Sequence, residues 1–359
     1  MLSSIGKSIA ALILACAIIA AVVLTLGASP TGVFAALYEG AFGTWYATAD
    51  TIVKSTPLIF TGLAISISFS GALWNIGADG QLTIGAIAAG AVGTHLGDFP
   101  HSIAIVIILA AGAFGGAMWG GIAGWLRARR DVNEVISTIM LNFVAVQMLS
   151  WMVHGPLMEP SRAYPTSSPI ASAAQLDFYF APSRLNLGML TAVILAVGCY
   201  VLLFNTSAGF ELRAMGRNRR AATFFGVRIP ALTVWVMALS GALAGLGGAV
   251  QVSAISHRLY EKLSPGWGFE AIAVALVARL NPLAIVPAAL LFGALDNGSQ
   301  AMQRTQGISP ELVQVIQGLV ILIILAFDTP AWSAIRENIF GASGDDAAAV
   351  PPVAEAPDA

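Results

Sequence analysis

The feature that most restricts the fold is a series of long segments without a charged side chain. No Asp, Glu, Lys or Arg occurs in residues 8–38, and the same holds for residues 99–126 and 229–257. About 20 apolar residues are enough for a helix to cross the hydrocarbon core of a bilayer. Charged residues make up only 10% of the chain, against about 25% in soluble domains. These segments therefore indicate a protein whose main solvent is lipid.

Ten candidate spans can be counted in this way. Every backbone polar group within a bilayer must find its partner inside the protein, so we predict an all-α fold, a polytopic transmembrane helical bundle of about ten spans. The first, Ser8–Gly27, is longer than the core of a typical signal peptide, and we expect it to be retained. The other nine lie within residues 55–78, 80–97, 99–126, 135–158, 185–210, 229–257, 263–278, 280–295 and 312–327.

Positive charges give the orientation, because Lys and Arg collect in cytoplasmic loops. If the N-terminus is inside and ten spans alternate, about two thirds of the 17 Lys and Arg residues face the cytoplasm. We therefore predict that both termini are cytoplasmic. Residues 1–340 are expected to form one transmembrane domain, and residues 341–359, rich in Ala, Pro and acidic residues, a disordered tail. The second to fifth and the seventh to tenth spans start from opposite sides, which suggests an inverted repeat.

Glycines recur every fourth residue in two predicted spans, at Gly112, Gly116, Gly120 and Gly124 and at Gly241 and Gly245. Small residues at this spacing let helix backbones approach closely in lipid. We predict close helix packing along both rows. This signal is general among membrane proteins and does not identify a function.

Polar and helix-breaking residues interrupt the apolar pattern at three places, residues 71–81, 263–270 and 279–282. Non-helical backbone at membrane depth is tolerated only inside protein or beside a water-filled cavity. Paired interruptions in the two halves of a chain point to a transport pathway. Ordinary loops between short helices are the alternative explanation.

Several side chains near these interruptions could line a pathway. Asn75 and Gln81 carry amides that suit hydroxyl groups or a nucleobase, and Trp267 and Phe269 offer a stacking surface beside Glu270. Each of them also fits a packing role.

A second group of candidates lies on one predicted helix. Glu134, Thr138 and Asn142 are spaced four apart and share one helix face, and polar side chains in a span usually face the bundle interior or a cavity. We expect this row to line the pathway. For Glu134 the alternative is a capping box with Asp131 at the start of the helix.

The loop between the sixth and seventh spans, residues 209–227, is rich in arginine. It should contain two short helices separated by Gly216, the second covering about residues 219–225 and ending at Gly226. Such a helix suits docking into a groove of another protein, although a solvated positive loop would also explain the charge. The candidate docking residues are Glu211, Arg213, Gly216, Asn218, Arg219, Ala221, Ala222 and Gly226.

The pattern of residues 209–226 resembles the coupling loop of ATP-binding cassette (ABC) importer permeases for branched-chain amino acids, simple sugars and nucleosides. Residues 75–81, 133–142 and 266–276, with Asn281-Pro282 downstream, resemble the signatures of the simple sugar/nucleoside branch. The resemblance runs from about Pro57 to Gly298. Asp79 stands where this branch often carries Glu.

The resemblance implies a bacterial inner-membrane transporter in which two permeases, identical or homologous, sit on two cytoplasmic ATPases. A periplasmic or lipid-anchored binding protein would deliver the solute. This chain is then expected to be a transport subunit and not an enzyme, to bind no cofactor or metal, and to use ATP hydrolysed by its partner. Gly6-Lys7-Ser8 alone does not make a phosphate-binding loop.

An ion-coupled secondary carrier for a small polar solute is the alternative. Carriers driven by protons or sodium commonly place acidic residues in the middle of the membrane, whereas the acidic residues here fall at predicted span ends. A membrane enzyme would need a nucleophilic or metal-binding constellation, and the sequence suggests none. The identity of the solute is left open.

Overall fold

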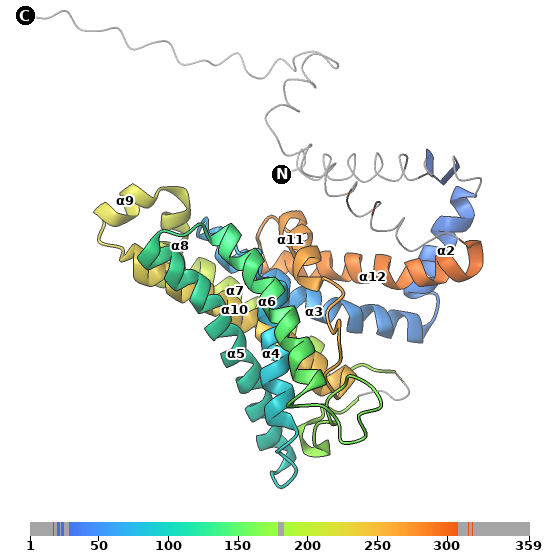
Figure 1. Cartoon of the computed structure of the whole chain (residues 1–359). Helices are drawn as coiled ribbons and strands as arrows, with labels where there is room; N and C mark the ends of the chain where they lie inside the picture. Colours follow the sequence, from blue (N-terminus) through green and yellow to red (C-terminus); the bar gives the residue numbers. More distant parts are fainter. Residues whose placement is uncertain are drawn as a thin grey trace, which may run out of the picture.

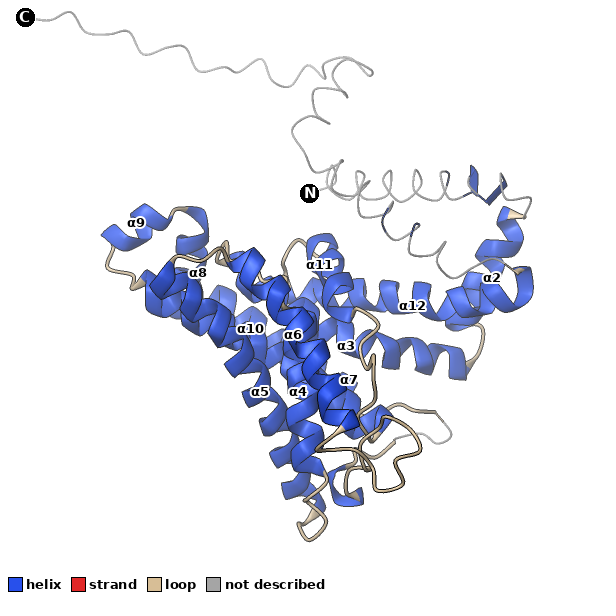
Figure 2. Ribbon diagram, in the orientation of Figure 1, coloured by secondary structure: helices blue, strands red, loops and turns tan. Residues whose placement is uncertain are grey.

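The computed structural model describes residues 29–178 and 183–307, together with the isolated positions 17, 20, 21, 23, 24, 315 and 318. Within this part all regular elements are helical, which confirms the predicted all-α class. The elements are α2 (Pro30–Phe42), α3 (Trp45–Ser70), α4 (Ala78–Gly93), α5 (His101–Arg130), α6 (Glu134–His154), the 3₁₀ turn η1 (Ser172–Ala174), α7 (Leu187–Asn205), α8 (Ser207–Arg217), α9 (Arg219–Phe224), α10 (Ile229–Val250), the π-helical turn η2 (Gln251–Ser256), α11 (Trp267–Val277) and α12 (Pro282–Gln306) (Figures 1 and 2).

Among the described residues, six helices are long and apolar enough to cross a membrane, namely α3, α5, α6, α7, α10 continued by η2, and α12. The third and eighth predicted spans are the short helices α4 and α11, with 16 and 11 residues. At 1.5 Å per residue they measure about 24 and 16 Å, less than the ~30 Å core of a bilayer. The predicted first and tenth spans, Ser8–Gly27 and Leu312–Phe327, and the tail 341–359 lie outside the described residues.

The close packing predicted along both glycine rows is present, and the structure shows that the rows pack α5 directly against α10. A Cβ atom added at Gly116 would lie 2.1 Å from the carbonyl oxygen of Gly241, and one at Gly241 would lie 2.1 Å from that of Gly116. Gly85 of α4 approaches the same seam, because its added Cβ would lie 2.3 Å from Cα of Gly245. Three helices therefore meet at backbone distance, which only glycine permits.

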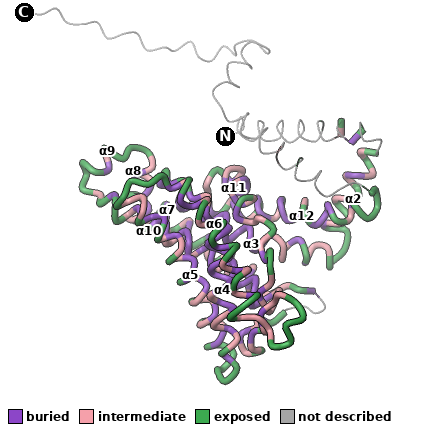
Figure 3. Tube along the Cα trace, in the orientation of Figure 1, coloured by how far each residue is buried: buried purple, intermediate pink, exposed green. Residues whose placement is uncertain are grey.

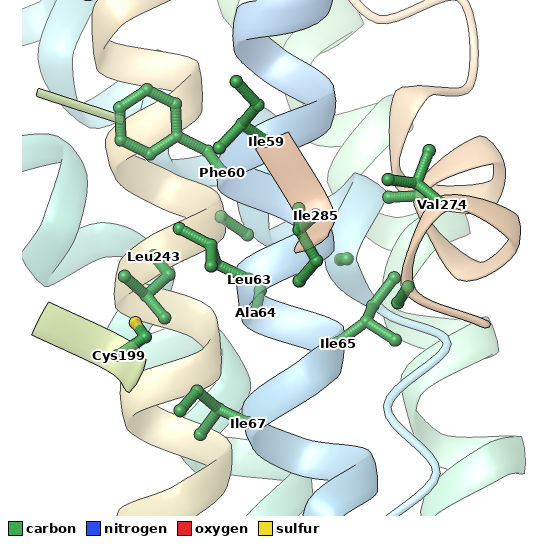
Figure 4. Packing of buried hydrophobic residues seen from close by; sticks show 14 of the residues in the cluster. Ile59, Phe60, Leu63, Ala64, Ile65, Ile67, Cys199, Leu243, Val274 and Ile285 are labelled. Carbon is green, nitrogen blue, oxygen red and sulfur yellow. The ribbon is translucent and has the colours of Figure 1, made fainter. Parts of the chain in front are cut away.

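Helix α3 is the centre of the larger apolar core (Figure 4). Its side chains Ile59, Phe60 and Leu63 are almost fully buried, and residues of α7, α10, α11 and α12 pack around them. Figure 3 shows this burial along α3, whereas α5 and α6 expose one side. An exposed apolar face is expected where lipid or another subunit completes the surface.

Helix α2 was not among the predicted spans. Ser29 accepts a hydrogen bond from the backbone N–H of Gly32, and Pro30 occupies the first turn, a combination that favours helix initiation. Asn297 of α12 ties α2 to α3, because its Nδ2 atom donates to the carbonyl oxygens of Gly40 at 3.0 Å and Ala47 at 2.9 Å.

Candidate functional site

The first interruption, residues 71–77 between α3 and α4, is built around a buried pair of amides. Asn75 donates from Nδ2 to Gln81 Oε1 at 2.9 Å, and Gln81 donates from Nε2 back to Asn75 Oδ1 at 3.0 Å. Asn75 also donates to Ser240 Oγ at 2.8 Å and accepts from the backbone N–H of Gly77 at 2.9 Å. Asn75 is fully buried, so its polar atoms are used to hold the non-helical turn in shape.

The polar row on α6 faces this same turn. Asn142 donates from Nδ2 to the carbonyl oxygen of Ile76 at 2.8 Å and accepts from the N–H of Gly80 at 2.9 Å. Thr138 accepts from the N–H of Ile76 at 3.3 Å. The shared helix face that the spacing predicts is confirmed, and its partners are backbone groups of the interrupted helix.

Glu134 is also buried, and it lies 3.1 Å from Nε of Arg127. The capping box with Asp131 is wrong. Asn133 caps α6 by accepting from the N–H of Val135, whereas Asp131 ends α5 in the left-handed conformation, with φ of 54°. The helix starts later than the box requires, because Asp131 and Val132 are needed for the turn between two antiparallel helices.

The second interruption, residues 263–266, is joined to the first by one carboxylate. Asp79 Oδ1 accepts from Ser264 Oγ at 2.6 Å and from the N–H of Gly268 at 3.0 Å. Gly268 is in the first turn of α11, where unpaired N–H groups favour an anion. A Cβ atom at Gly268 would lie 2.1 Å from the backbone nitrogen of Asp79. The starts of α4 and α11 are therefore in direct contact.

The remaining candidates of this region lie on α11. Trp267 packs against the α3 core, Glu270 is partly buried, and Phe269 is 49% exposed. Phe269 therefore presents an aromatic face to whatever fills the space beside α11. In the third interruption, Ser66 of α3 donates to the carbonyl oxygen of Leu280 at 2.6 Å, and Asn281 caps α12.

One charged pair was missed from the sequence. Lys54 Nζ lies 2.9 Å from Asp296 Oδ2, and the side chain of Asp296 is 51% exposed. Lys54 is nine residues from the start of α3 and Asp296 ten residues from the end of α12, which places both about 15 Å from the helix ends. Asp296, which the predicted spans placed at a span end, therefore lies well inside α12. Asp296 also lies within electrostatic range of Glu270.

The arginine-rich loop folds into α8 and α9. They separate at Asn218 and not at Gly216 as predicted, because the Asn218 side chain caps α9 by accepting from the N–H of Ala221 at 3.0 Å. Gly216 lies within α8 and against α3, since its added Cβ would lie 2.3 Å from the carbonyl oxygen of Ser70. Gly226, with φ of 87°, follows α9 as expected.

Helices α8 and α9 each have one side buried against the rest of the protein and one side exposed. Leu212, Met215 and Ala222 are buried, and Arg213 stacks over the ring of Phe204 at 5.0 Å. The exposed side carries charged and aromatic groups, with Phe224 87% and Phe225 82% exposed. Its exposed residues include Glu211, Arg217, Asn218, Arg219, Arg220, Thr223, Phe224 and Phe225, and Ala221 lies at its edge.

Among the residues that the structure describes, no group of three or more His, Cys, Asp or Glu side chains is placed to hold a metal ion. The features of the candidate site are the α8–α9 loop at the surface, the three helix interruptions, and the charged pair of Lys54 and Asp296.

Comparison with known proteins agrees with this arrangement. Residues 47–325 match the family described as branched-chain amino acid transport system, permease component. A guanosine ABC transporter permease of Bacillus subtilis is 35% identical over 90% of this chain and 93% of its own length. A glucose ABC transporter permease of Haloferax volcanii is 31% identical (89% and 87%), and a nucleoside ABC transporter permease of Lactococcus lactis is 31% identical (85% and 86%). No solved structure matches. The chain belongs to the permease family of branched-chain amino acid transport systems and is a multi-pass membrane permease of the ABC type.

Proposed function

We propose that this chain imports a nucleoside, as one permease subunit of an ABC transporter in the bacterial inner membrane. The observation that carries the proposal is the position of α8 and α9: α8 rests on the end of α3, and the two helices together expose two phenylalanines and several arginines. The nucleoside is favoured over a simple sugar because the guanosine relative has both a higher identity and a higher coverage than the glucose relative. A simple sugar is the second candidate.

The exposed side of α8 and α9 is the surface that we assign to a cytoplasmic ATPase. An apolar pair such as Phe224 and Phe225 costs free energy in water and gains it in a protein groove. ATP is bound and hydrolysed by that partner. A second permease, identical or homologous, and a solute-binding protein outside the membrane complete the transporter, with both termini of this chain in the cytoplasm.

The contacts of α8 would connect a bound ATPase directly to the end of α3 in the membrane domain. Met215 and Leu212 lie against Gly71, at the point where α3 ends, and Gly216 lies against Ser70. The turn that follows is bound to α6 through Asn142, and Asp79 in the first turn of α4 binds α11. A displacement of α8 therefore reaches each interrupted helix through direct contacts and needs no intervening flexible segment.

We assign the pathway to the region beside α3, α11 and α12, where the following side chains lie. Lys54, Asp296 and Glu270 offer charged groups, and Phe269 offers a ring on which a base could stack. A half-exposed carboxylate deep within a span is costly in lipid, which supports a watery path or a subunit contact beside Asp296. Asn75, Gln81, Glu134, Thr138 and Asn142 then position the broken helices, and Trp267 anchors α11.

The test is uptake of labelled guanosine, ribose and glucose by vesicles that contain the purified complex with its ATPase and binding protein. We expect guanosine uptake that requires ATP and continues when a protonophore collapses the proton gradient. Sugar uptake with no nucleoside uptake would select the second candidate. Uptake that persists without the ATPase would reject the ABC assignment for a carrier.

A further inference from the structure

A groove of about 1000 Å³ lies apart from the interrupted helices, between the end of α5 and the start of α10 and beside α9. Most of its wall is apolar. Its lining residues are Trp125, Ala128, Arg129, Thr223, Val227, Arg228, Ile229, Pro230, Ala231, Val234, Trp235 and Ala238. None of them belongs to the proposed pathway or to the contacts of α8 with α3.

Two positive charges stand at the rim of this groove without a counterion from the part of the chain that the structure describes. Arg129 and Arg228 are exposed, and neither forms an ion pair with any residue in 29–178 or 183–307. The neighbouring Arg127 differs, because it pairs with Asp131 at 2.8 Å and with Glu134 at 3.1 Å. The groove therefore offers two guanidinium groups to an external anion.

The apolar wall extends away from these arginines into the membrane. Trp125 is one helical turn deeper than Arg129 on α5, and Trp235 is seven residues, or about 10 Å, deeper than Arg228 on α10. Both helices are long and apolar enough to cross a membrane, and in such a span their charged ends would lie at headgroup level and the wall at acyl-chain level. Tryptophan at this depth is typical of membrane interfaces. An ATPase docked on the surface would not reach this depth.

We propose that the groove binds an acidic phospholipid, with its phosphate between Arg129 and Arg228 and an acyl chain along Trp125, Val234 and Trp235. Basic pockets between transmembrane helices suit such headgroups, and guanidinium groups bind phosphate with paired hydrogen bonds. The position beside Thr223 and Val227 would place the lipid against the linker that leaves α9. The lipid would thereby support the element that contacts the ATPase.

The experiment counts phospholipids that stay bound to the intact, purified transporter in native mass spectrometry, with phosphatidylglycerol and phosphatidylethanolamine supplied in equal amounts. We expect selective retention of phosphatidylglycerol, and a roughly 30-fold weaker retention in the double variant Arg129→Gln/Arg228→Gln, at about 1 kcal/mol for each arginine. The matched control Arg130→Gln/Arg162→Gln removes two exposed charges outside the groove and should retain the lipid. Ala231→Trp, which fills the groove and keeps its charge, should also release it.

Equal retention in the groove and control variants would overturn the proposal. So would loss of the ATPase or of the second permease from the double variant with lipid still bound, because the groove would then be a protein interface. Lipid counting requires no transport, so its result is independent of which solute is carried.

Discussion

The Asp79 carboxylate accepts a hydrogen bond from the backbone N–H of Gly268 at 3.0 Å, between two residues that are 189 positions apart in the sequence. This contact makes the first turn of α4 a cap for the first turn of α11. Neither helix is long enough to span a bilayer, so the backbone groups at its end need partners within the protein. Asp79 supplies one for α11, and Asn142 of α6 supplies one for α4. The backbones of Asp79 and Gly268 lie very close together. The Asp side chain, which is shorter than the Glu that often occupies this position in the sugar/nucleoside branch, fits this short distance.

Gly268→Ala should destabilise this junction. The added methyl group would overlap the backbone nitrogen of Asp79, at 2.1 Å, and overpacking of this kind costs about 1–3 kcal/mol. We expect a lower apparent unfolding temperature of the purified permease and a loss of uptake. Gly198→Ala in α7 is the matched control, because no atom lies within 4 Å of its added Cβ. Equal unfolding temperatures for the two variants would show that the contact is not close.

Asn142→Ala should lower stability and uptake together. It leaves the buried carbonyl of Ile76 and the N–H of Gly80 without their partner, and each unsatisfied group costs about 1–3 kcal/mol. Gln147→Ala removes an exposed amide from the same helix and should change neither property. If Asn142→Ala abolished uptake while the unfolding temperature stayed at the wild-type value, Asn142 would be a solute contact and not a positioning residue.

The charged pair in α3 and α12 should be needed for transport. Lys54→Met or Asp296→Asn leaves one charge without its partner at membrane depth, so we expect each to reduce uptake at least roughly tenfold, or about 1.4 kcal/mol. The exchanged pair Lys54→Asp/Asp296→Lys should recover part of it. Asp98→Asn, in the exposed loop between α4 and α5, serves as the control. Wild-type uptake in both single variants would remove the pair from the pathway.

Loss of the two exposed phenylalanines should detach the ATPase. Burial of one phenylalanine contributes about 1.5–3 kcal/mol, so Phe224→Ala/Phe225→Ala should weaken the association more than tenfold in a pull-down with the ATPase subunit. Phe114→Ala removes a comparably exposed phenylalanine from α5 and should leave the association unchanged. Undiminished binding by the double variant would place the ATPase elsewhere.

Much of the fold could be predicted because backbone polar groups within a bilayer must be hydrogen-bonded inside the protein, which restricts the chain to few kinds of structure. The apolar runs predict helices, and the glycine rows at Gly112–Gly124 and Gly241–Gly245 predict close helix packing along each row; that the two rows pack against each other is seen only in the structure. The interruptions at 71–81 and 263–270 were visible as polar residues within apolar sequence. That one carboxylate joins them could not be read from spacing, because a contact over 189 residues depends on how the helices assemble.

The charged pair was missed for a definite reason. Counting charge-free intervals puts the charges that bound an interval at the ends of spans, so Lys54 and Asp296 were assigned to helix ends. Thr44, which caps α3 by accepting from the N–H of Ala47, was the available signal that this helix begins well before Lys54. Asn218 was a comparable signal for the start of α9, since asparagine is a favoured N-cap residue.

The central claim is that α8 and α9 face the cytoplasm, and sided cysteine labelling tests it most directly. In a Cys16→Ser/Cys199→Ser background, Arg220→Cys on α9 and Tyr164→Cys in the loop after α6 would each be exposed to a membrane-impermeant maleimide. The account predicts that position 164 is labelled in spheroplasts and position 220 only after the membrane is opened. Labelling of position 220 in sealed spheroplasts would contradict the assignment of this surface to an ATPase.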